Sequence, residues 1–239
     1  MGTLFVVGTP IGNLEDLTVR AARVLGQVQL VAAEDTRVTR RLLSHLGIRV
    51  SLVSYHEHNQ RARIPQLLEA LESGDVALVS DAGMPAVSDP GSELVSRAAA
   101  AGFRVESVPG VSALTTALAA SGLSADAFLF LGFLPRRSKG RRQSLRAASS
   151  LPLTLVAFEA PHRLRATLKD MLAELGDREV AVCRELTKLH EEVFRGSLSE
   201  ALEHFQAPLG ELVLVVRGAP EEASLAGPGP SQLEEGREE

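Results

Sequence analysis

Short apolar runs alternate along this chain with segments whose apolar residues recur at the helical period, and this alternation constrains the fold more than any other feature. The runs are rich in Val and Leu and end in turn residues, as do strands that are buried on both faces of a sheet. They occupy residues 3–8, 29–33, 76–80, 103–108, 128–131, 153–158, 179–184 and 211–216. Helical periodicity marks residues 64–71, 94–101, 113–120, 164–175 and 199–205. This order predicts an α/β fold with substantially parallel sheets.

A domain boundary is expected near residues 121–126, where small and polar residues cluster between two strand–helix sets. We therefore predict two α/β domains, at residues 1–122 and 123–218. The remaining residues, 219–239, hold six glutamates and one arginine and so account for the whole net charge of −5. This composition is typical of a disordered, solvated tail, and it leaves the rest of the chain neutral overall.

Composition also excludes several classes of protein. No apolar run approaches the roughly 18 residues that span a bilayer, and no basic segment followed by an apolar stretch marks a secretory signal. Cys183 is the single cysteine, which excludes an intramolecular disulfide and leaves too few soft ligands for a structural zinc site. His56 and His58 lack further ligands at a plausible spacing, so no metal is expected. The sequence predicts a cytoplasmic protein with no membrane segment.

Three glycine-rich loops in the first half follow predicted strands, where α/β sheets place ligands. They span residues 8–18, 80–91 and 109–113. In the second loop, Asp81 could bond a ribose diol or an ammonium group, or could merely cap its own loop. We expect the next helix to start with Ser88 or Asp89 as its N-cap and Pro90 in its first turn. Each loop alone is also compatible with a plain tight turn.

Charged motifs end strands elsewhere in the chain. Carboxylates and cations occur together in residues 34–37 (EDTR), 158–163 (FEAPHR) and 184–192 (RELTKLHEE). This combination favours either a substrate cleft or a cluster of ion pairs whose charges neutralise one another. Between residues 127 and 158 there is no acid, and the basic residues are Arg136, Arg137, Lys139, Arg141, Arg142 and Arg146. This run indicates either a phosphate-binding patch or a solvated basic helix, since no aromatic residue lies among the arginines.

Eight motifs together resemble one family. TPIGNLEDLT, EDTR, HEHN, SDAGMPAVSDPG, PGVSA, GFLP, EAPHR and RELTK occur in the order and rough spacing of the bacterial ribosomal RNA small subunit methyltransferase I family. That family belongs to the tetrapyrrole (corrin/porphyrin) methylase superfamily, which uses S-adenosylmethionine. The resemblance covers residues 3 to about 218. Two positions depart from it, because Met84 stands where Thr is expected and Val111 where Pro is expected. The acidic tail replaces a basic C-terminal segment that many relatives carry.

The resemblance implies two α/β domains with the cofactor in a cleft between them, the arrangement of class III S-adenosylmethionine-dependent methyltransferases, and a homodimer. It implies methylation of the ribose 2′-hydroxyl of one cytidine in the decoding region of 16S rRNA, within the small ribosomal subunit. Cofactor-binding residues are then expected at Pro10, Asp81, Gly83, Val87, Ser88, Ser112, Ala113, Phe158, Arg184, Gly210 and Leu212.

A hydroxyl nucleophile must lose its proton during or after attack, and a carboxylate or a neutral lysine can accept it. We therefore hypothesise that Lys188, with Glu185 or Glu159, is the catalytic group. The expected RNA-binding residues are Arg37, Arg136, Arg137, Lys139, Arg141, Arg142 and Arg163. Two alternatives stay open: C-methylation of a tetrapyrrole, whose carboxylates would also suit arginines, and a non-catalytic RNA-binding factor of ribosome assembly.

Overall fold

The computed structural model describes residues 1–220 of the chain, and its contacts divide the chain into two compact units. Unit 1 comprises Met1–Thr116 together with Glu185–Glu191, and unit 2 comprises Ala117–Arg184 and the chain from Glu192. The division thus falls earlier than the predicted boundary at residue 122, and seven residues of the second half return to unit 1. The predicted acidic tail lies, from residue 221, outside the described residues.

Unit 1 is built on a parallel sheet with strand order β3-β2-β4-β1-β5. Its strands are β1 (Thr3–Val7), β2 (Leu30–Ala33), β3 (Ser51–Ser54), β4 (Val76–Val79) and β5 (Arg104–Val108). Its helices are α1 (Val19–Leu25), α2 (Thr36–His45), α3 (Gln60–Ser73) and α4 (Ser92–Ala100), and a 3-10 turn spans Leu14–Asp16. The parallel sheet predicted for this half is confirmed.

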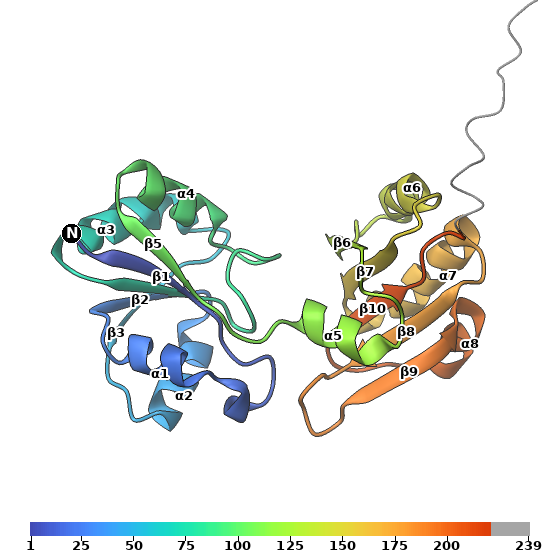
Figure 1. Ribbon diagram of the computed structural model, residues 1–239, viewed down its shortest axis with the longest axis horizontal. Helices are drawn as coiled ribbons and strands as arrows, with labels where there is room; N and C mark the ends of the chain where they lie inside the picture. The colour runs from blue at the N-terminus through green and yellow to red at the C-terminus, as the bar shows by residue number, and fades with distance from the viewer. Residues whose placement is uncertain (221–239) are drawn as a thin grey trace, which may run out of the picture. The chain divides into compact units, whose positions relative to one another are not determined.

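Two apolar cores fill the two faces of that sheet. Helices α3 and α4 cover one face and α1 and α2 cover the other, above and below the sheet in Figure 1. Because side chains alternate along a strand, Leu4 of β1 contributes to the α3–α4 core and Val7 of the same strand to the α1–α2 core. Covering both faces explains why the strands are apolar throughout, as β4 shows with four buried residues in succession.

Unit 2 contains a mixed sheet with strand order β6-β7-β10-β8-β9. Its strands are β6 (Phe128–Phe133), β7 (Thr154–Glu159), β8 (Glu179–Arg184), β9 (Glu192–Ser197) and β10 (Leu212–Val216). Only β6 and β7 pair in parallel among the described strands of this sheet, whereas β10 runs antiparallel to β7 and β8, and β9 runs antiparallel to β8. The expectation of a substantially parallel sheet is therefore wrong for this half.

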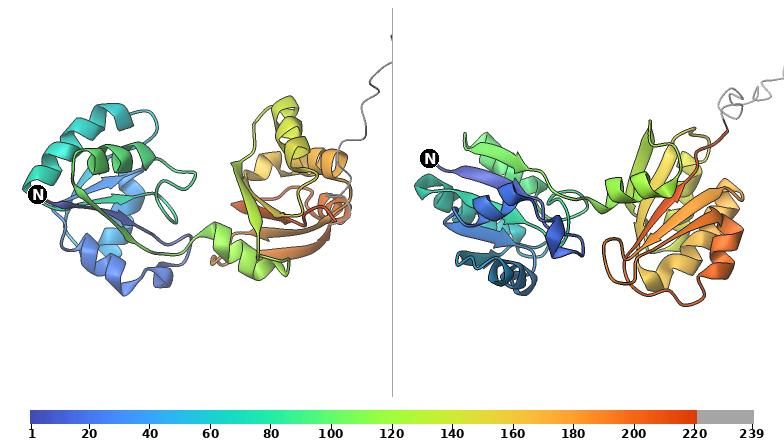
Figure 2. Two further views of the ribbon diagram at one scale, coloured as in Figure 1. Left: turned by 45° about the horizontal axis from the view of Figure 1, so that its top comes forward. Right: turned by 60° about the horizontal axis from the view of Figure 1, so that its bottom comes forward.

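Three helices of unit 2 share one core on one face of the sheet. They are α6 (Ser138–Ala148), α7 (Leu164–Leu175) and α8 (Leu198–His204), which pack Leu145, Leu168 and Leu198 among other residues against β7, β8 and β10. The two units divide within helix α5 (Ala113–Ser121), which can be followed in Figure 2. The carbonyl of Ala117 in this helix lies 3.9 Å from the Sγ atom of Cys183 in β8. No helix among residues 1–220 is long and apolar enough to cross a bilayer.

Candidate functional site

The first two predicted loops meet at the carboxyl end of the parallel sheet. Thr9 follows β1 and Gly83 follows β4, and the two residues exchange backbone hydrogen bonds of 2.9 and 3.0 Å. The Thr9 hydroxyl also donates to the carbonyl of Ser80 at 3.2 Å. Gly83 has a φ of +78°, a conformation that glycine adopts without strain. The predicted residues Pro10 and Gly83 therefore belong to loops that are joined directly to each other.

The first and third loops approach each other through two glycines. A Cβ atom added to Gly8 would lie 2.8 Å from the backbone N and Cα of Gly110, and the reverse contact would be 2.9 Å. Only glycine permits this approach of two backbones. Ser112 then directly precedes α5, and its carbonyl accepts a hydrogen bond of 2.9 Å from the amide of Thr116. The three predicted loops are thus brought together, with Ser112 and Ala113 at the start of a helix.

The second loop carries backbone strain. Ala86 and Ser88 have φ values of 68° and 62°, which non-glycine residues adopt at a cost of order 1–3 kcal/mol. Gly91 is the N-cap residue of α4, so the helix starts later than the Ser88 or Asp89 cap that we expected. The left-handed turn at Ser88 and the φ of 149° at Gly91 redirect the chain before the helix can form. Val87, between the strained residues, is 42% exposed.

Carboxylates gather beside these loops. Asp81 accepts a hydrogen bond of 2.9 Å from the amide of Asp35, and the amide of Asp81 donates to Glu34 at 3.3 Å. Burial raises the pKa of Asp89 to about 6, the charge of Glu34 adds to this shift, and a hydrogen bond to Ser80 opposes it. Burial also raises the pKa of Asp81 and of Glu34. Among residues 1–220, no group of three or more His, Cys, Asp or Glu residues is arranged to hold a metal ion.

Arg37, a predicted RNA contact, lies at the start of α2 beside these carboxylates. Its guanidinium pairs with Asp35 at 2.5 Å, and its side chain is 82% exposed. The hydrogen bonds from Arg37 lower the pKa of Asp35 to about 2. Arg37 therefore presents a charge that is already partly compensated, which weakens its attraction for phosphate.

The segment Glu185–Glu191 belongs to unit 1 because it packs on the first loop. The Thr187 hydroxyl accepts a hydrogen bond of 3.0 Å from the amide of Asn13, and a Cβ atom at Gly12 would lie 2.4 Å from Cγ of Lys188. Lys188 Nζ lies 3.0 Å from Glu185 Oε1. Glu185 and Thr187 have φ values of 50° and 67°. In the described chain, the non-glycine residues with positive φ all lie in this segment and in residues 80–91, two of the loops predicted to carry site residues.

The predicted residues of unit 2 gather at one end of the mixed sheet. Leu212 pairs in register with Glu159 on one side and with Arg184 on the other, and Val213 pairs with Phe158. Gly210, with a φ of 86°, lies two residues before Leu212. Arg184 donates to Glu192 at 2.8 Å. The sheet register therefore places Phe158, Glu159, Arg184 and Leu212 on three adjacent strands.

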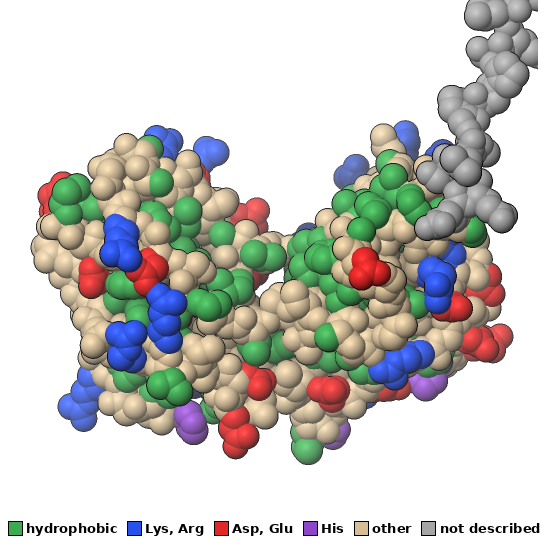
Figure 3. Space-filling view, in the orientation of Figure 1, with side chains coloured by type: hydrophobic (Ala, Val, Ile, Leu, Met, Phe, Trp, Pro, Cys, Tyr) green, Lys and Arg blue, Asp and Glu red, His purple; other side chains and the backbone are tan. Residues whose placement is uncertain are grey.

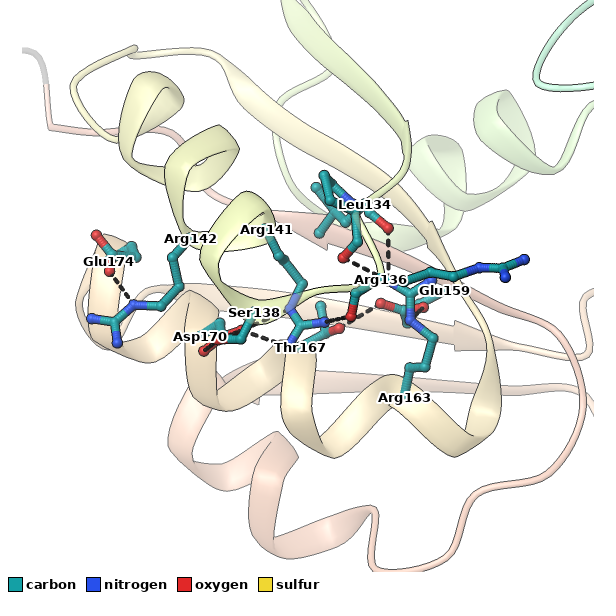
Figure 4. A network of polar contacts seen from close by, with 11 residues as sticks. Leu134, Arg136, Ser138, Arg141, Arg142, Glu159, Arg163, Thr167, Asp170 and Glu174 are labelled. Carbon is teal, nitrogen blue, oxygen red and sulfur yellow. Dashed lines mark hydrogen bonds and ion pairs between the residues drawn. The ribbon is translucent and has the colours of Figure 1, made fainter.

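Glu159 lies in a buried polar network rather than at an open position (Figure 4). Its side chain is inaccessible to solvent, one oxygen accepts the hydroxyl of Thr167, and the other accepts the amide of Ala160 at 2.8 Å. The same oxygen lies 3.2 Å from Nε of Arg163. Arg163 in turn donates to the carbonyls of Leu134 at 2.7 Å and Pro135 at 3.2 Å. Neither the base role of Glu159 nor the phosphate role of Arg163 fits these contacts.

The basic run also differs from its predicted role. Arg141 is 4% exposed and its guanidinium pairs with Asp170 of α7, because this arginine lies on the face of α6 that packs against α7. Arg142 and Arg146 both pair with Glu174, at 2.5 and 2.9 Å. We therefore withdraw Arg141 from the expected RNA contacts and regard the charge of Arg142 as compensated. Within this run, Arg136, Arg137 and Lys139 are exposed and have no carboxylate partner among the described residues.

Several residues that hold these loops together were not singled out from the sequence. Thr9, Gly110 and Thr187 lie inside quoted motifs, so the motifs pointed to the right segments without identifying these contacts. Thr167 and Asp170 lie outside every motif. For Thr167 the available signal was a polar residue on the apolar face of a helix, between Leu164 and Leu168, which are buried. Asp170 is only partly buried and gave no such signal.

Comparison with known proteins agrees with this geometry. The family described as Tetrapyrrole (Corrin/Porphyrin) Methylases matches residues 3–202. This chain belongs to that family. Its curated relatives include proteins named ribosomal RNA small subunit methyltransferase I. The protein of Halalkalibacterium halodurans is 52% identical over 91% of this chain and 76% of its own length. That of Thermotoga maritima is 51% identical over 91% and 99%.

Solved structures support the same family fold. Uroporphyrin-III-C-methyltransferase from Thermus thermophilus matches with a TM-score of 0.64 and 26% identity, over 90% of this chain and 94% of that one. The methyltransferase CobJ matches with a TM-score of 0.69 and 20% identity, over 91% and 95%. The second likeness concerns the fold alone.

The two departures from the family motif both fall on the converging loops. The Sδ atom of Met84 would lie 2.7 Å from a Cβ atom at Gly8, so this side chain packs over the glycine contact of the first and third loops. The carbonyl of Met84 accepts the amide of Val87 at 3.4 Å. The carbonyl of Val111 lies 3.7 Å from a Cβ position at Gly83. The contacts that Met84 and Val111 make here through their carbonyls are backbone contacts. A carbonyl is present whichever side chain the position carries.

Proposed function

We propose that this chain transfers a methyl group from S-adenosylmethionine to the RNA of the small ribosomal subunit. The identity of 52% over 91% of the chain with a relative that bears this activity in its name carries the proposal. Within it, the target is the ribose 2′-hydroxyl of one cytidine in the decoding region of 16S rRNA, as the motif resemblance implies. The homodimer that the resemblance implies and the cytoplasmic location that the composition predicts belong to the same proposal.

The loops of unit 1 fit the proposed cofactor. The Gly8–Gly110 approach and the Thr9–Gly83 bridge hold three loops at one sheet edge, so their amides and carbonyls can serve a ligand. Asp81 supplies a carboxylate suited to ribose hydroxyls or an ammonium group. Pro10, Val87, Ser88, Ser112 and Ala113 would contribute backbone atoms. When bound, S-adenosylmethionine supplies a methyl group that its sulfonium centre has already activated.

The chain's own part in the reaction is alignment and proton removal. Attack by the 2′-oxygen forms an oxygen–carbon bond as the carbon–sulfur bond breaks, with the three atoms in line, and the hydroxyl proton must leave. We assign its removal to the pair of Lys188 and Glu185, whose polar atoms lie 3.0 Å apart on a strained segment that packs against the first loop. Glu159 is left out of this role because its oxygens already bond Thr167 and Ala160.

The proposal is tested by methyl transfer in vitro. The purified full chain is incubated with labelled S-adenosylmethionine and, separately, with small ribosomal subunits that lack the modification and with a tetrapyrrole precursor. Label on one cytidine ribose supports the proposal. Label on the tetrapyrrole alone would favour the activity named for the uroporphyrin-III-C-methyltransferase that the fold resembles at 26% identity. Cofactor binding without transfer to either would favour a non-catalytic factor.

A further inference from the structure

The surface of unit 2 that surrounds residues 133–139 combines an exposed aromatic ring with exposed cations. Phe133, the last residue of β6, is 58% exposed. Arg136, Arg137 and Lys139 follow it within one loop and the first turn of α6, and all three are exposed. Figure 3 shows hydrophobic side chains gathered over β6 and Lys and Arg side chains projecting from the part of unit 2 that carries α6.

The ring of Phe133 is fixed although it is exposed. It packs edge-to-face on Phe158 with ring centroids 5.5 Å apart, and Phe130 packs on the same ring at 5.0 Å. A bulge in β6 allows both Phe130 and Phe133 to pack on the ring of Phe158. Phe130 pairs with Val156 and Phe133 with Phe158, so β6 uses one residue more than β7 over this stretch, at Gly132 with its φ of 60°. Bulges of this kind redirect side chains and are frequent next to functional sites.

The loop between the aromatic ring and the cations is held from beneath. The guanidinium of Arg163 binds the carbonyls of Leu134 and Pro135, and Nη1 of Arg141 lies 3.4 Å from the carbonyl of Arg136. Each arginine is itself held by a carboxylate of low exposure, Glu159 for Arg163 and Asp170 for Arg141 (Figure 4). Three successive carbonyls are therefore fixed, so a ligand that binds this loop need not order it.

The cations of this surface are available for a ligand. Within residues 1–220, the structure gives Arg136, Arg137 and Lys139 no carboxylate partner, whereas the other arginines of α6 are paired with Asp170 and Glu174. Uncompensated cations attract phosphate, and an exposed aromatic face attracts an unstacked base. A single strand of RNA offers both at once, since a duplex hides its base faces.

We propose that Phe133, Arg136, Arg137 and Lys139 form a binding surface for single-stranded RNA, in which Phe133 stacks on one base and the three cations contact neighbouring phosphates. The proposal rests on the proposed function for the identity of the RNA, and it deepens that function by assigning the contacts. It predicts that the substrate nucleotides reach the enzyme in an unpaired state.

The absence of tryptophan from the whole sequence makes stacking directly measurable. Phe133→Trp would introduce a single reporter at the proposed stacking position, and Val19→Trp, at a residue that is 88% exposed on α1, would introduce a matched reporter elsewhere. Each full-length variant is titrated with a short unstructured oligoribonucleotide and with inorganic polyphosphate, without cofactor. We expect RNA to quench the emission of the Phe133 reporter and leave the Val19 reporter unchanged, and we expect polyphosphate to quench neither.

The salt dependence of RNA affinity distinguishes the contribution of the three cations from that of the Phe133 ring. Replacing Arg136, Arg137 and Lys139 together by Gln should reduce the slope of log affinity against log salt by about 2, at roughly 0.7 per phosphate contact in a single strand. Replacing Arg142 and Arg146 by Gln should leave the slope unchanged. Phe133→Ala should weaken binding about tenfold at every salt concentration, without a change of slope.

These readouts measure RNA binding alone, so they distinguish the failure of this surface from the failure of the proposed methyl transfer. An unquenched Phe133 reporter together with a Phe133→Asp variant that alters the sedimentation of the protein would overturn the proposal. That result would assign the surface to a contact with a second copy of the chain. Equal slopes for the two cation variants would also overturn it.

Discussion

Gly8 and Gly110 lie so close that a Cβ atom on Gly110 would approach the Cα atom of Gly8 to 2.9 Å and its carbonyl carbon to 3.0 Å. Two loops separated by about a hundred residues of sequence thus touch backbone to backbone at the edge where the parallel strands end. Since both partners are main chain, no side-chain rotation can relieve an added methyl group. The convergence of the loops of unit 1 therefore depends on this glycine pair.

Gly110→Ala should weaken binding of S-adenosylmethionine about tenfold, because overpacking at a rigid contact costs about 1–3 kcal/mol. Titration calorimetry of the full chain measures the effect. Gly26→Ala is the matched control. Gly26 has a φ of −82°, and a Cβ atom added there would meet its nearest neighbour at an ordinary 3.6 Å. Unchanged affinity in Gly110→Ala would show that the loop approach does not shape the cofactor site.

Lys188→Ala should lower kcat by about 10²-fold with little change in KM, as expected for loss of a proton acceptor. Lys188→Arg should be equally slow, since an arginine keeps its proton and its positive charge at all accessible pH values. Lys169→Ala, at an exposed position of α7, is the control. Single-turnover methyl transfer measures all three variants. Recovery of kcat in Lys188→Arg would mean that the lysine acts through its charge alone.

Asp89→Asn should stabilise the chain at pH 7.5 and change its stability profile with pH. Because burial raises the pKa of Asp89 to about 6, the folded state binds this proton more tightly than the unfolded state does. Stability from this group is therefore fully present at low pH and is lost as the pH rises from about 4 through 6. After allowance for solvent screening we expect about 1 kcal/mol at pH 7.5.

Thermal unfolding between pH 5 and pH 8 measures this gain. The variant should show a smaller loss of melting temperature over that range than the wild type. Glu57→Gln, which removes an exposed carboxylate before α3, should leave the wild-type profile in place. Identical profiles for Asp89→Asn and the wild type would mean that Asp89 titrates as an ordinary exposed carboxylate.

Arg141→Ala should destabilise unit 2 by about 3 kcal/mol, because it leaves the low-exposure carboxylate of Asp170 without its cation. The double variant Arg141→Met with Asp170→Leu should recover most of this loss, since an apolar pair of similar volume replaces a buried ion pair at little cost. Chemical denaturation compares the variants. If the single variant unfolded like the wild type, the Arg141–Asp170 pair would contribute nothing to stability.

The sequence predicted unit 1 well because its local signals agree with one another. Its strands are buried on both faces, so their apolar runs stand out, and the loops that follow them are rich in glycine. The contacts between those loops could not be predicted, because the Thr9–Gly83 bridge joins residues whose pairing no local pattern encodes. The start of α4 was placed too early because capping residues at Ser88 and Asp89 give the usual signal, whereas the strained backbone at Ser88 overrides it.

Unit 2 was harder to predict because its decisive contacts are distant in sequence. The basic run from Arg136 to Arg146 contains no acid, yet Asp170 and Glu174 of α7 neutralise three of its arginines across the helix interface. Strand β9 has only two apolar residues, Val193 and Phe194, beside Glu192 and Arg195. It lies at the edge of the sheet and gives no clear alternation. Local pattern also cannot distinguish a parallel from an antiparallel neighbour, which is why the sheet direction was missed.

The activity that we propose for this chain is methylation of the ribose of one cytidine in small-subunit RNA. Mass mapping of rRNA nucleosides from a strain that lacks the gene, and from the same strain complemented with the wild-type chain, tests it most directly. We expect one 2′-O-methylcytidine to disappear from the small-subunit RNA of the strain without the gene and to return with the wild-type chain. An identical set of modified nucleosides in both strains would contradict it.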